Sequence, residues 1–148
     1  MHGRALAGGC GLALACDLVV ARADAVLGFP EIRRGFVPAM VLALLRRAVG
    51  EKVAFDLAAT GRSVEAPEAE RLGLVSRVLP GRGFDGAVAK LLASLAAASP
   101  SALALLKQEF HRLDGMGFEE GVRLGARVNA AARQTPDFAR AVAAFLRR

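Results

Sequence analysis

With 148 residues and a mass of 15.4 kDa, the chain is long enough for one domain with a hydrophobic core and too short for two of ordinary size. Its 54% apolar content and mean hydropathy of +0.38 exclude a disordered protein. Its two cysteines exclude a disulfide scaffold, and the absence of Trp and Tyr argues against a nucleic-acid-binding surface built from stacked aromatic side chains. The net charge of +6 comes from dispersed arginines, which favours an arginine-rich surface, with attraction of an anionic ligand as the alternative.

The first half of the chain alternates short strand signals with short helices. Gly8 and Gly9 predict a tight turn, and the small apolar residues 10–16 after them predict a short helix. Pro30 ends the strand predicted over 26–28, because proline cannot continue a central sheet ladder. No strand signal precedes the turn, so we expect the front of a strand-turn-helix unit to be missing. The other predicted elements are strands over 18–21 and 74–79, an extended pair at 63–64, and helices over 38–49, 51–59 and 67–72.

From Phe84 onward the pattern is helical throughout. Ser99-Pro100 and Thr135-Pro136 each predict an N-cap residue followed by proline at the first helical position. The whole pattern predicts an α/β fold in which short strands and helices come first and an all-helical region follows. A buried apolar stripe is predicted along the helix after Ser99, formed by Leu103, Leu106, Phe110 and Leu113.

Two local features could carry chemistry. A glycine-rich turn at a helix start presents backbone N–H groups that can bind phosphate or stabilise a developing oxyanion, or it is simply a tight turn with close packing. Glu31 follows Pro30 between apolar residues, where a carboxylate is partly desolvated and suits proton transfer. The alternative for Glu31 is an exposed loop carboxylate paired with Arg33 or Arg34.

A series of short motifs runs in order along almost the whole chain, over 3–17, 19–21, 27–32, 35–38, 44–50, 54–57, 60–62, 66–69, 73–75, 99–102 and at Lys107. This ordered set resembles the enoyl-CoA hydratase/isomerase family, the crotonase superfamily. The resemblance implies the C-terminal portion of a crotonase-like spiral α/β fold, with roughly the first third of a usual member absent. It further implies that 1–80 form the last part of the spiral core, with the catalytic groups, and that 81–148 form a helical oligomerisation region.

The resemblance also implies a site for a CoA thioester. In the family, two backbone N–H groups hold the thioester carbonyl oxygen while an enolate-like anion forms. Gly8 matches the position of one donor, and the other donor belongs to an earlier segment that this chain lacks. Glu31 matches the second of two family carboxylates and would move a proton at the α or γ carbon of the substrate. Gly11 stands at the first carboxylate position and has no side chain.

Gly11 and the missing earlier segment leave three functions open. The first is hydration of a 2-enoyl-CoA by a lyase with Gly8 as oxyanion donor and Glu31 as the acid/base. Sequences resembling methylglutaconyl-CoA hydratases share this glycine and the Pro38-Ala39 pair. The second is isomerisation of an enoyl-CoA double bond by Glu31 alone. The third is a truncated, non-catalytic fragment that acts only as an oligomerisation partner, so the isolated chain is expected to have little or no activity.

The remaining expectations concern the walls of the site. Met40 belongs to a stretch, Ala39-Met40-Val41, that is rich in glycine in many members, and these bulkier side chains either narrow the acyl pocket or pack as an ordinary helix. Phe145 and Arg148 resemble a segment that reaches the CoA of a neighbouring subunit, with a frayed terminus as the alternative. The residues expected to line the substrate are Ala7, Gly9, Gly11, Phe29, Pro30, Val37, Pro38 and Met40.

The partners expected from the resemblance are an acyl-CoA thioester and further copies of the chain, in a trimer or hexamer. No cofactor is expected beyond the CoA of the substrate, and no metal-ligand spacing is present in the sequence. No uncharged apolar run reaches the ~18–20 residues that a membrane span needs, and neither a membrane nor nucleic acid is expected as a partner. Two reduced cysteines fit a cytoplasmic protein.

Overall fold

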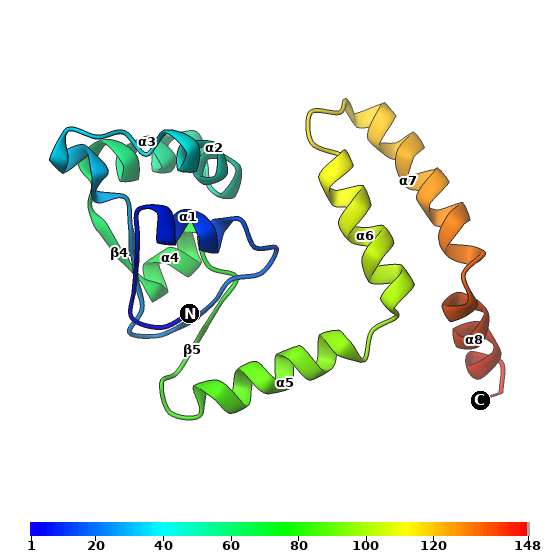
Figure 1. The fold of residues 1–148 in the computed structure, drawn as a ribbon. Coiled ribbons are helices and arrows are strands. Elements are labelled where there is room, and N and C mark those ends of the chain that lie inside the picture. The colour runs from blue at the N-terminus through cyan, green and yellow to red at the C-terminus, as the bar shows by residue number, and fades with distance from the viewer. Residues whose placement is uncertain (148) are drawn as a thin grey trace. The chain divides into compact units, whose positions relative to one another are not determined.

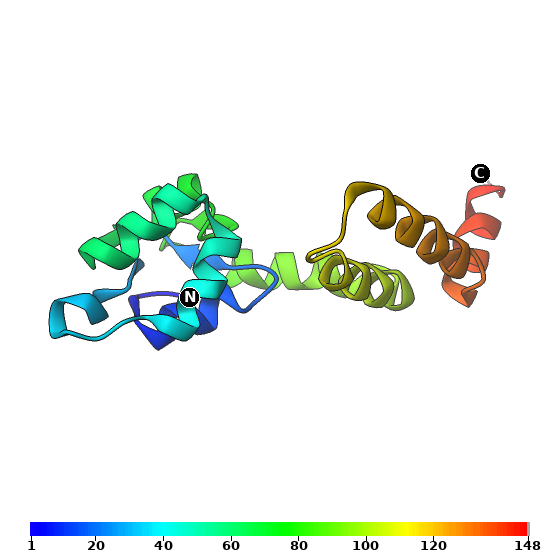
Figure 2. The ribbon, with the colours of Figure 1, turned by 90° about the horizontal axis from the view of Figure 1, so that it is seen from above.

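The computed structural model describes residues 1–147. The chain divides into two units, Met1–Ala89 and the residues from Lys90 onward, and helix α5 (Phe84–Ala96) crosses the boundary between them. The first unit holds all the strands of the described residues, and the second is helical, as Figures 1 and 2 show from two directions. The structure is therefore mixed α/β with an all-helical second half, which confirms the predicted fold class.

The strands of the first unit are three residues long and form two small sheets. In the three-stranded sheet the order is β1-β3-β4, with β1 parallel and β4 antiparallel to the central strand β3. The second sheet pairs β2 with β5 in parallel. Their bounds are β1 Arg4–Leu6, β2 Val20–Arg22, β3 Val26–Gly28, β4 Ser63–Glu65 and β5 Arg77–Leu79.

Strand β1 overturns the prediction that no strand leads into the glycine-rich turn. Three residues are too few to show a period-two pattern, and what makes this segment a strand is its pairing with β3, in which Leu6 lies opposite Gly28. The strand expected over 74–79 is likewise shorter. Leu74 and Val75 both donate their backbone N–H to the carbonyl of Ala69, at 2.9 and 3.3 Å, so they belong to the turn that closes the preceding helix.

The helices of the first unit surround an apolar core. The segment after β3 forms a 3-10 helix η1, whose end is capped by Gly35 in the left-handed region at φ 70°. Fully buried Leu27 and Phe29 from the central strand and its exit pack in one cluster with Leu45 and Leu57 from the following helices. The bounds are α1 Gly8–Leu14, η1 Pro30–Arg34, α2 Ala39–Ala48, α3 Glu51–Thr60 and α4 Ala66–Leu72.

The second unit contains three helices that contact one another, α6 Pro100–Arg112, α7 Phe118–Arg133 and α8 Pro136–Phe145. Both predicted N-caps are confirmed, because Ser99 Oγ accepts from the Ala102 N–H at 3.2 Å and Thr135 Oγ1 accepts from the Phe138 N–H at 3.3 Å. The predicted buried stripe on α6 is wrong. Helical spacing shows which residues share a face, but burial needs a facing surface, and the four side chains are exposed, namely Leu103, Leu106, Phe110 and Leu113.

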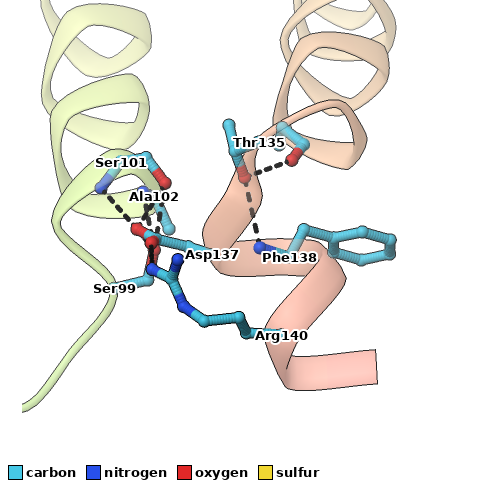
Figure 3. A network of polar contacts seen from close by, with 8 residues as sticks. Ser99, Ser101, Ala102, Thr135, Asp137, Phe138 and Arg140 are labelled. Atoms are coloured by element: carbon cyan, nitrogen blue, oxygen red, sulfur yellow. Dashed lines mark hydrogen bonds and ion pairs between the residues drawn. The ribbon is translucent and has the colours of Figure 1, made fainter. Parts of the chain in front are cut away.

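The start of α6 and the start of α8 are joined by a network centred on Asp137 (Figure 3). Asp137 Oδ2 accepts hydrogen bonds from Ser99 Oγ at 2.7 Å and from both Oγ and the backbone N–H of Ser101, at 2.6 and 3.1 Å. Its other oxygen, Oδ1, pairs with Arg140. Hydrogen bonds from the two serines lower the pKa of Asp137 to about 2, because they stabilise the ionised carboxylate.

Within residues 1–147, no single helix is both long and apolar enough to cross a bilayer, and α5 and α6 reach that length only when they are taken together as a bent pair.

Candidate functional site

The two residues expected to carry chemistry leave the sheet from neighbouring strands. Strands β1 and β3 run parallel and both end at the pair formed by Leu6 and Gly28. Ala7 then donates its N–H to the Gly28 carbonyl at 2.9 Å, so the segments that leave β1 and β3 remain hydrogen-bonded for one more residue. Gly8 begins α1 directly after the first exit, and Glu31 lies in η1 after the second. Carboxyl ends of adjacent parallel strands are a common place for ligand sites in α/β folds.

Ala7 turns the chain from β1 into α1 in an unusual backbone conformation. Its φ of 55° and ψ of −127° lie in a region that glycine adopts easily and alanine does not, and it is the one non-glycine residue of positive φ in the described chain. Such strain persists only where surrounding contacts impose it. Here the Ala7 N–H bonds Gly28 and the Ala7 carbonyl accepts from the Gly11 N–H at 3.0 Å, so both sides of the turn are held.

The first turn of α1 remains open to a ligand. Ala7 has no side-chain oxygen that could cap the helix, so the first N–H groups of α1 receive no capping bond from it. Gly8 and Gly9 are exposed, and a Cβ atom built on either one would meet nothing within 4 Å. The backbone at Gly8 and Gly9 therefore borders open space, at the helix end where the N–H groups lack a side-chain cap.

Glu31 is half-buried and incompletely paired. Its Oε2 atom is inaccessible to water and has no hydrogen-bond partner. Buried carboxylate oxygens are normally hydrogen-bonded, so an unpaired one in a native structure marks strain or a functional group. The alternative of a loop carboxylate paired through this oxygen with Arg33 or Arg34 is not what the structure shows. Arg33 instead donates from Nε to the Thr60 carbonyl at 3.2 Å.

Cys10 connects the two halves of the site. This fully buried residue lies on α1, two positions after Gly8. Burial raises the pKa of the Cys10 thiol to about 11, a backbone hydrogen bond with Gly28 opposes that shift, and the charge of Glu31 adds to it. The thiol thus interacts with both the end of β3 and the Glu31 carboxylate. The start of α1 and Glu31 consequently belong to one neighbourhood of the first unit.

Gly11 is buried against the next helix. A Cβ atom at this position would lie 2.7 Å from Val41 Cγ2, closer than real Cβ atoms approach, and 3.0 Å from Val41 Cγ1, which is a very tight contact. The side chain of Val41, on α2, therefore fills the room that a side chain at position 11 would need. The bulk of Val41 is evident from the sequence, but its contact with Gly11 is not, because the two residues are thirty positions apart and only the packing of α1 on α2 brings them together.

The other predicted lining residues have varied surroundings. Phe29 is fully buried in the core and Pro38 is buried, whereas Pro30 is half-buried. Val37 and Met40 are exposed, with 90% of the Met40 side chain accessible. In the second unit, Phe145 is exposed near the end of α8. Arg148, the other residue expected to contact CoA, lies outside the described residues.

A separate hollow of about 740 Å³ lies on the first unit, along α2 and α3. None of the predicted site residues lines it, and both of its carboxylates are paired, Glu51 with Arg46 and Asp56 with Arg62. In the part of the chain that the structure describes, no three metal-ligating side chains gather in one place. The geometry at the end of β1 and β3 remains the better candidate site.

The sequence of the chain is similar to those of known proteins over nearly its whole length. The sequence profile of the enoyl-CoA hydratase/isomerase family matches residues 1–148. A Thermus thermophilus protein, provisionally named an enoyl-CoA hydratase, is 50% identical over 146 residues, which cover 98% of this chain and 57% of the relative. The 2,3-dehydroadipyl-CoA hydratase of Escherichia coli is 34% identical, with 100% of this chain and 58% of that protein covered. The chain thus spans somewhat more than half of the length of these relatives.

Solved structures agree with the sequence comparison. The crystal structure of an enoyl-CoA hydratase from Mycobacterium smegmatis superposes with a TM-score of 0.95 at 33% identity, over 99% of this chain and 57% of that one. Human enoyl coenzyme A hydratase domain-containing protein 3 superposes with a TM-score of 0.94 at 27% identity, over 98% and 57%.

Proposed function

Because the chain belongs to the enoyl-CoA hydratase/isomerase family, we propose that it supplies the oxyanion donor Gly8 and the acid/base Glu31 of an enzyme acting on enoyl-CoA thioesters. The observation that carries this proposal is the unpaired buried Oε2 of Glu31, at the same sheet edge as the open first turn of α1. An oxygen that has lost water without gaining a protein partner is ready to exchange a proton with a bound substrate. The name of the Thermus thermophilus relative supports the same class of substrate.

The first candidate reaction is hydration of a 2-enoyl-CoA. The Gly8 N–H would bind the thioester carbonyl oxygen, and Glu31 would accept a proton from a water molecule as the water oxygen bonds to C3. The electron pair of the double bond would move through C2 onto the carbonyl oxygen, giving an enolate held by Gly8. Glu31 would then return its proton to C2, completing the addition of water. One backbone donor of this kind typically contributes on the order of 10²–10³ in rate.

The second candidate is isomerisation of a 3-enoyl-CoA, and the contact between Gly11 and Val41 favours it. Methyl groups fill the room beside Gly11, so no carboxylate at that position could share the work of Glu31. A single carboxylate can remove a proton from C2, while the Gly8 N–H holds the dienolate oxygen, and deliver the proton to C4. No water molecule needs to be positioned for that reaction. The two candidates share the same residues and differ in whether water is added.

The further expectations of the proposal concern assembly and location. A homo-oligomer, as a trimer or hexamer, is supported by exposed apolar side chains on the second unit, such as Phe118 and Phe145. We place the enzyme in the cytoplasm, with the CoA of its substrate as the sole cofactor. Residues at the end of α8 would contact the CoA of a neighbouring subunit.

Kinetics of the full-length protein with Glu31→Gln test the proposal. We expect kcat/KM on the enoyl-CoA that the wild type uses to fall by roughly 10²–10⁴, because glutamine keeps the shape but cannot transfer the proton. Incubation with a 2-enoyl-CoA and with a 3-enoyl-CoA separates the candidates, since a 3-hydroxyacyl-CoA product from the former shows hydration. Glu65→Gln, an exposed glutamate at the end of β4, is the matched control and should retain activity. Equal turnover by the wild type and Glu31→Gln would refute the proposed role.

A further inference from the structure

Two glycines of α1, one at its start and one at its middle, have opposite surroundings. Gly8 and Gly11 are three positions apart and so share a face of the helix. The space beside Gly8 is open, whereas the space beside Gly11 is filled by the two methyl groups of Val41, at 2.7 and 3.0 Å from where a Cβ would stand. One turn along this face from the proposed oxyanion donor, an aliphatic side chain fills the space beside the helix.

Val41 is held firmly enough to form a lasting wall. It lies in the first turn of α2, is partly buried, and packs against the apolar core cluster of the first unit. As a β-branched residue in a helix it has one strongly preferred χ1 rotamer, so its methyl groups cannot easily swing aside. The wall is also apolar, which disfavours any water molecule that would need two or more polar partners beside Gly11.

We propose that Gly11 and Val41 form a size-matched pair and that Val41 determines the reaction specificity of the site. Its side chain occupies the surface between α1 and α2 beside Gly11, the α1–α2 wall, and so excludes water and any second proton-transfer group from it. This inference rests on the proposed enoyl-CoA function. With that wall closed, Glu31 works alone and the site favours proton shuttling between carbons. With the wall opened, water gains room near Glu31 and hydration rises relative to isomerisation.

The steric part of the proposal is tested by melting temperature. Gly11→Ala should lower the Tm of the full-length protein by on the order of 5 °C, because its Cβ overlaps the Val41 methyls. Val41→Ala removes both clashing atoms and leaves only the Val41 Cβ at 3.4 Å, an ordinary contact, so Gly11→Ala combined with Val41→Ala should regain most of that loss. Gly9→Ala, on the same helix but beside open space, should not lower the Tm. Equal effects of Gly11→Ala with valine or alanine at position 41 would overturn the pairing.

The specificity part is tested by the ratio of hydration to isomerisation, measured as kcat on matched 2-enoyl and 3-enoyl substrates. Val41→Ala should raise this ratio at least threefold, and Gly11→Glu with Val41→Ala should raise it tenfold or more. Leu42→Ala is the matched control, since Leu42 is the next residue of α2, is partly buried, and lines the separate hollow along α3. Its ratio should equal that of the wild type.

The outcomes distinguish this inference from the function on which it rests. A wild-type enzyme that is active but whose ratio is unchanged in Val41→Ala overturns the role of Val41 and leaves the proposed function intact. A wild-type enzyme that hydrates without isomerising also overturns it, because the wall would then not restrict water. A full-length protein that acts on neither substrate refutes the proposed function and this inference together. Val41→Ala is a mild truncation, so the result does not depend on whether the Gly11→Glu variant folds.

Discussion

Ala7 stores backbone strain at the entrance to α1, and that strain can be measured. Ala7→Gly should raise the free energy of unfolding by about 1 kcal/mol, because relief of the φ 55° conformation outweighs the extra freedom of glycine in the unfolded chain. Equilibrium denaturation checks the value. Ala5→Gly, in the middle of β1, is the control and should lose roughly 0.5–1 kcal/mol. A loss of stability in Ala7→Gly would show that Ala7 is not strained.

Single residues were predictable where their signal is local. Gly8 and Glu31 stand out from the sequence because a glycine pair before a helix and a glutamate after proline are short patterns, and the structure brings their elements to one sheet edge. The strain at Ala7 and the contact between Gly11 and Val41 could not be predicted in this way. Each depends on a close approach between segments, and no pattern within either segment records it.

The network between α6 and α8 makes a prediction at the scale of helices. The pKa of Asp137 in the folded chain is about 2, below its ordinary 3.8, so the ionised form is favoured by folding. This contribution is fully present above pH 4 and is lost as the pH falls from about 4 toward 2. Asp137→Asn should therefore lower the Tm by a few degrees at pH 7, and the difference from the wild type should shrink over that acidic range.

Thermal melts of the chain at a series of pH values between 7 and 2 provide the check. Glu120→Gln removes an exposed acidic residue from the first turn of α7, and the structure gives it no comparable set of serine donors. Its Tm should stay within about 1–2 °C of the wild type, since exposed surface groups contribute little. A difference between Asp137→Asn and the wild type that stays constant down to pH 2 would contradict the assigned role of the network.

Elements were predictable to different degrees for the same physical reason. The helices after Ser99 and Thr135 were recognised because an N-cap and the proline after it act within one turn, and both caps form as expected. Strand β1 was missed because three residues become a strand only by pairing with β3, over twenty positions away. The burial of the α6 stripe was wrong because periodicity reports a shared face and not a covering partner.

At the scale of the whole molecule, the exposed apolar side chains of the second unit predict self-association. Phe118, at the start of α7, is 87% exposed, which is unusual for a phenylalanine of a lone domain. The full-length protein should sediment at a multiple of its own mass, and Phe118→Asp should shift the equilibrium toward smaller species. Gln134→Asp introduces the same charge at the end of α7 and should leave the mass unchanged. A wild type that is monomeric at micromolar concentration would refute this expectation.

The proposed function requires the Gly8 N–H and the Glu31 carboxylate to act on the same bound thioester. A crystal structure of the full-length protein with an unreactive acyl-CoA measures this directly. We predict the thioester carbonyl oxygen about 2.7–3.1 Å from the Gly8 nitrogen, and Glu31 Oε2 within about 3.5 Å of a carbon adjacent to that thioester or of the water beside it. An acyl chain bound with its carbonyl out of reach of Gly8, or with Glu31 turned away from it, would contradict the account.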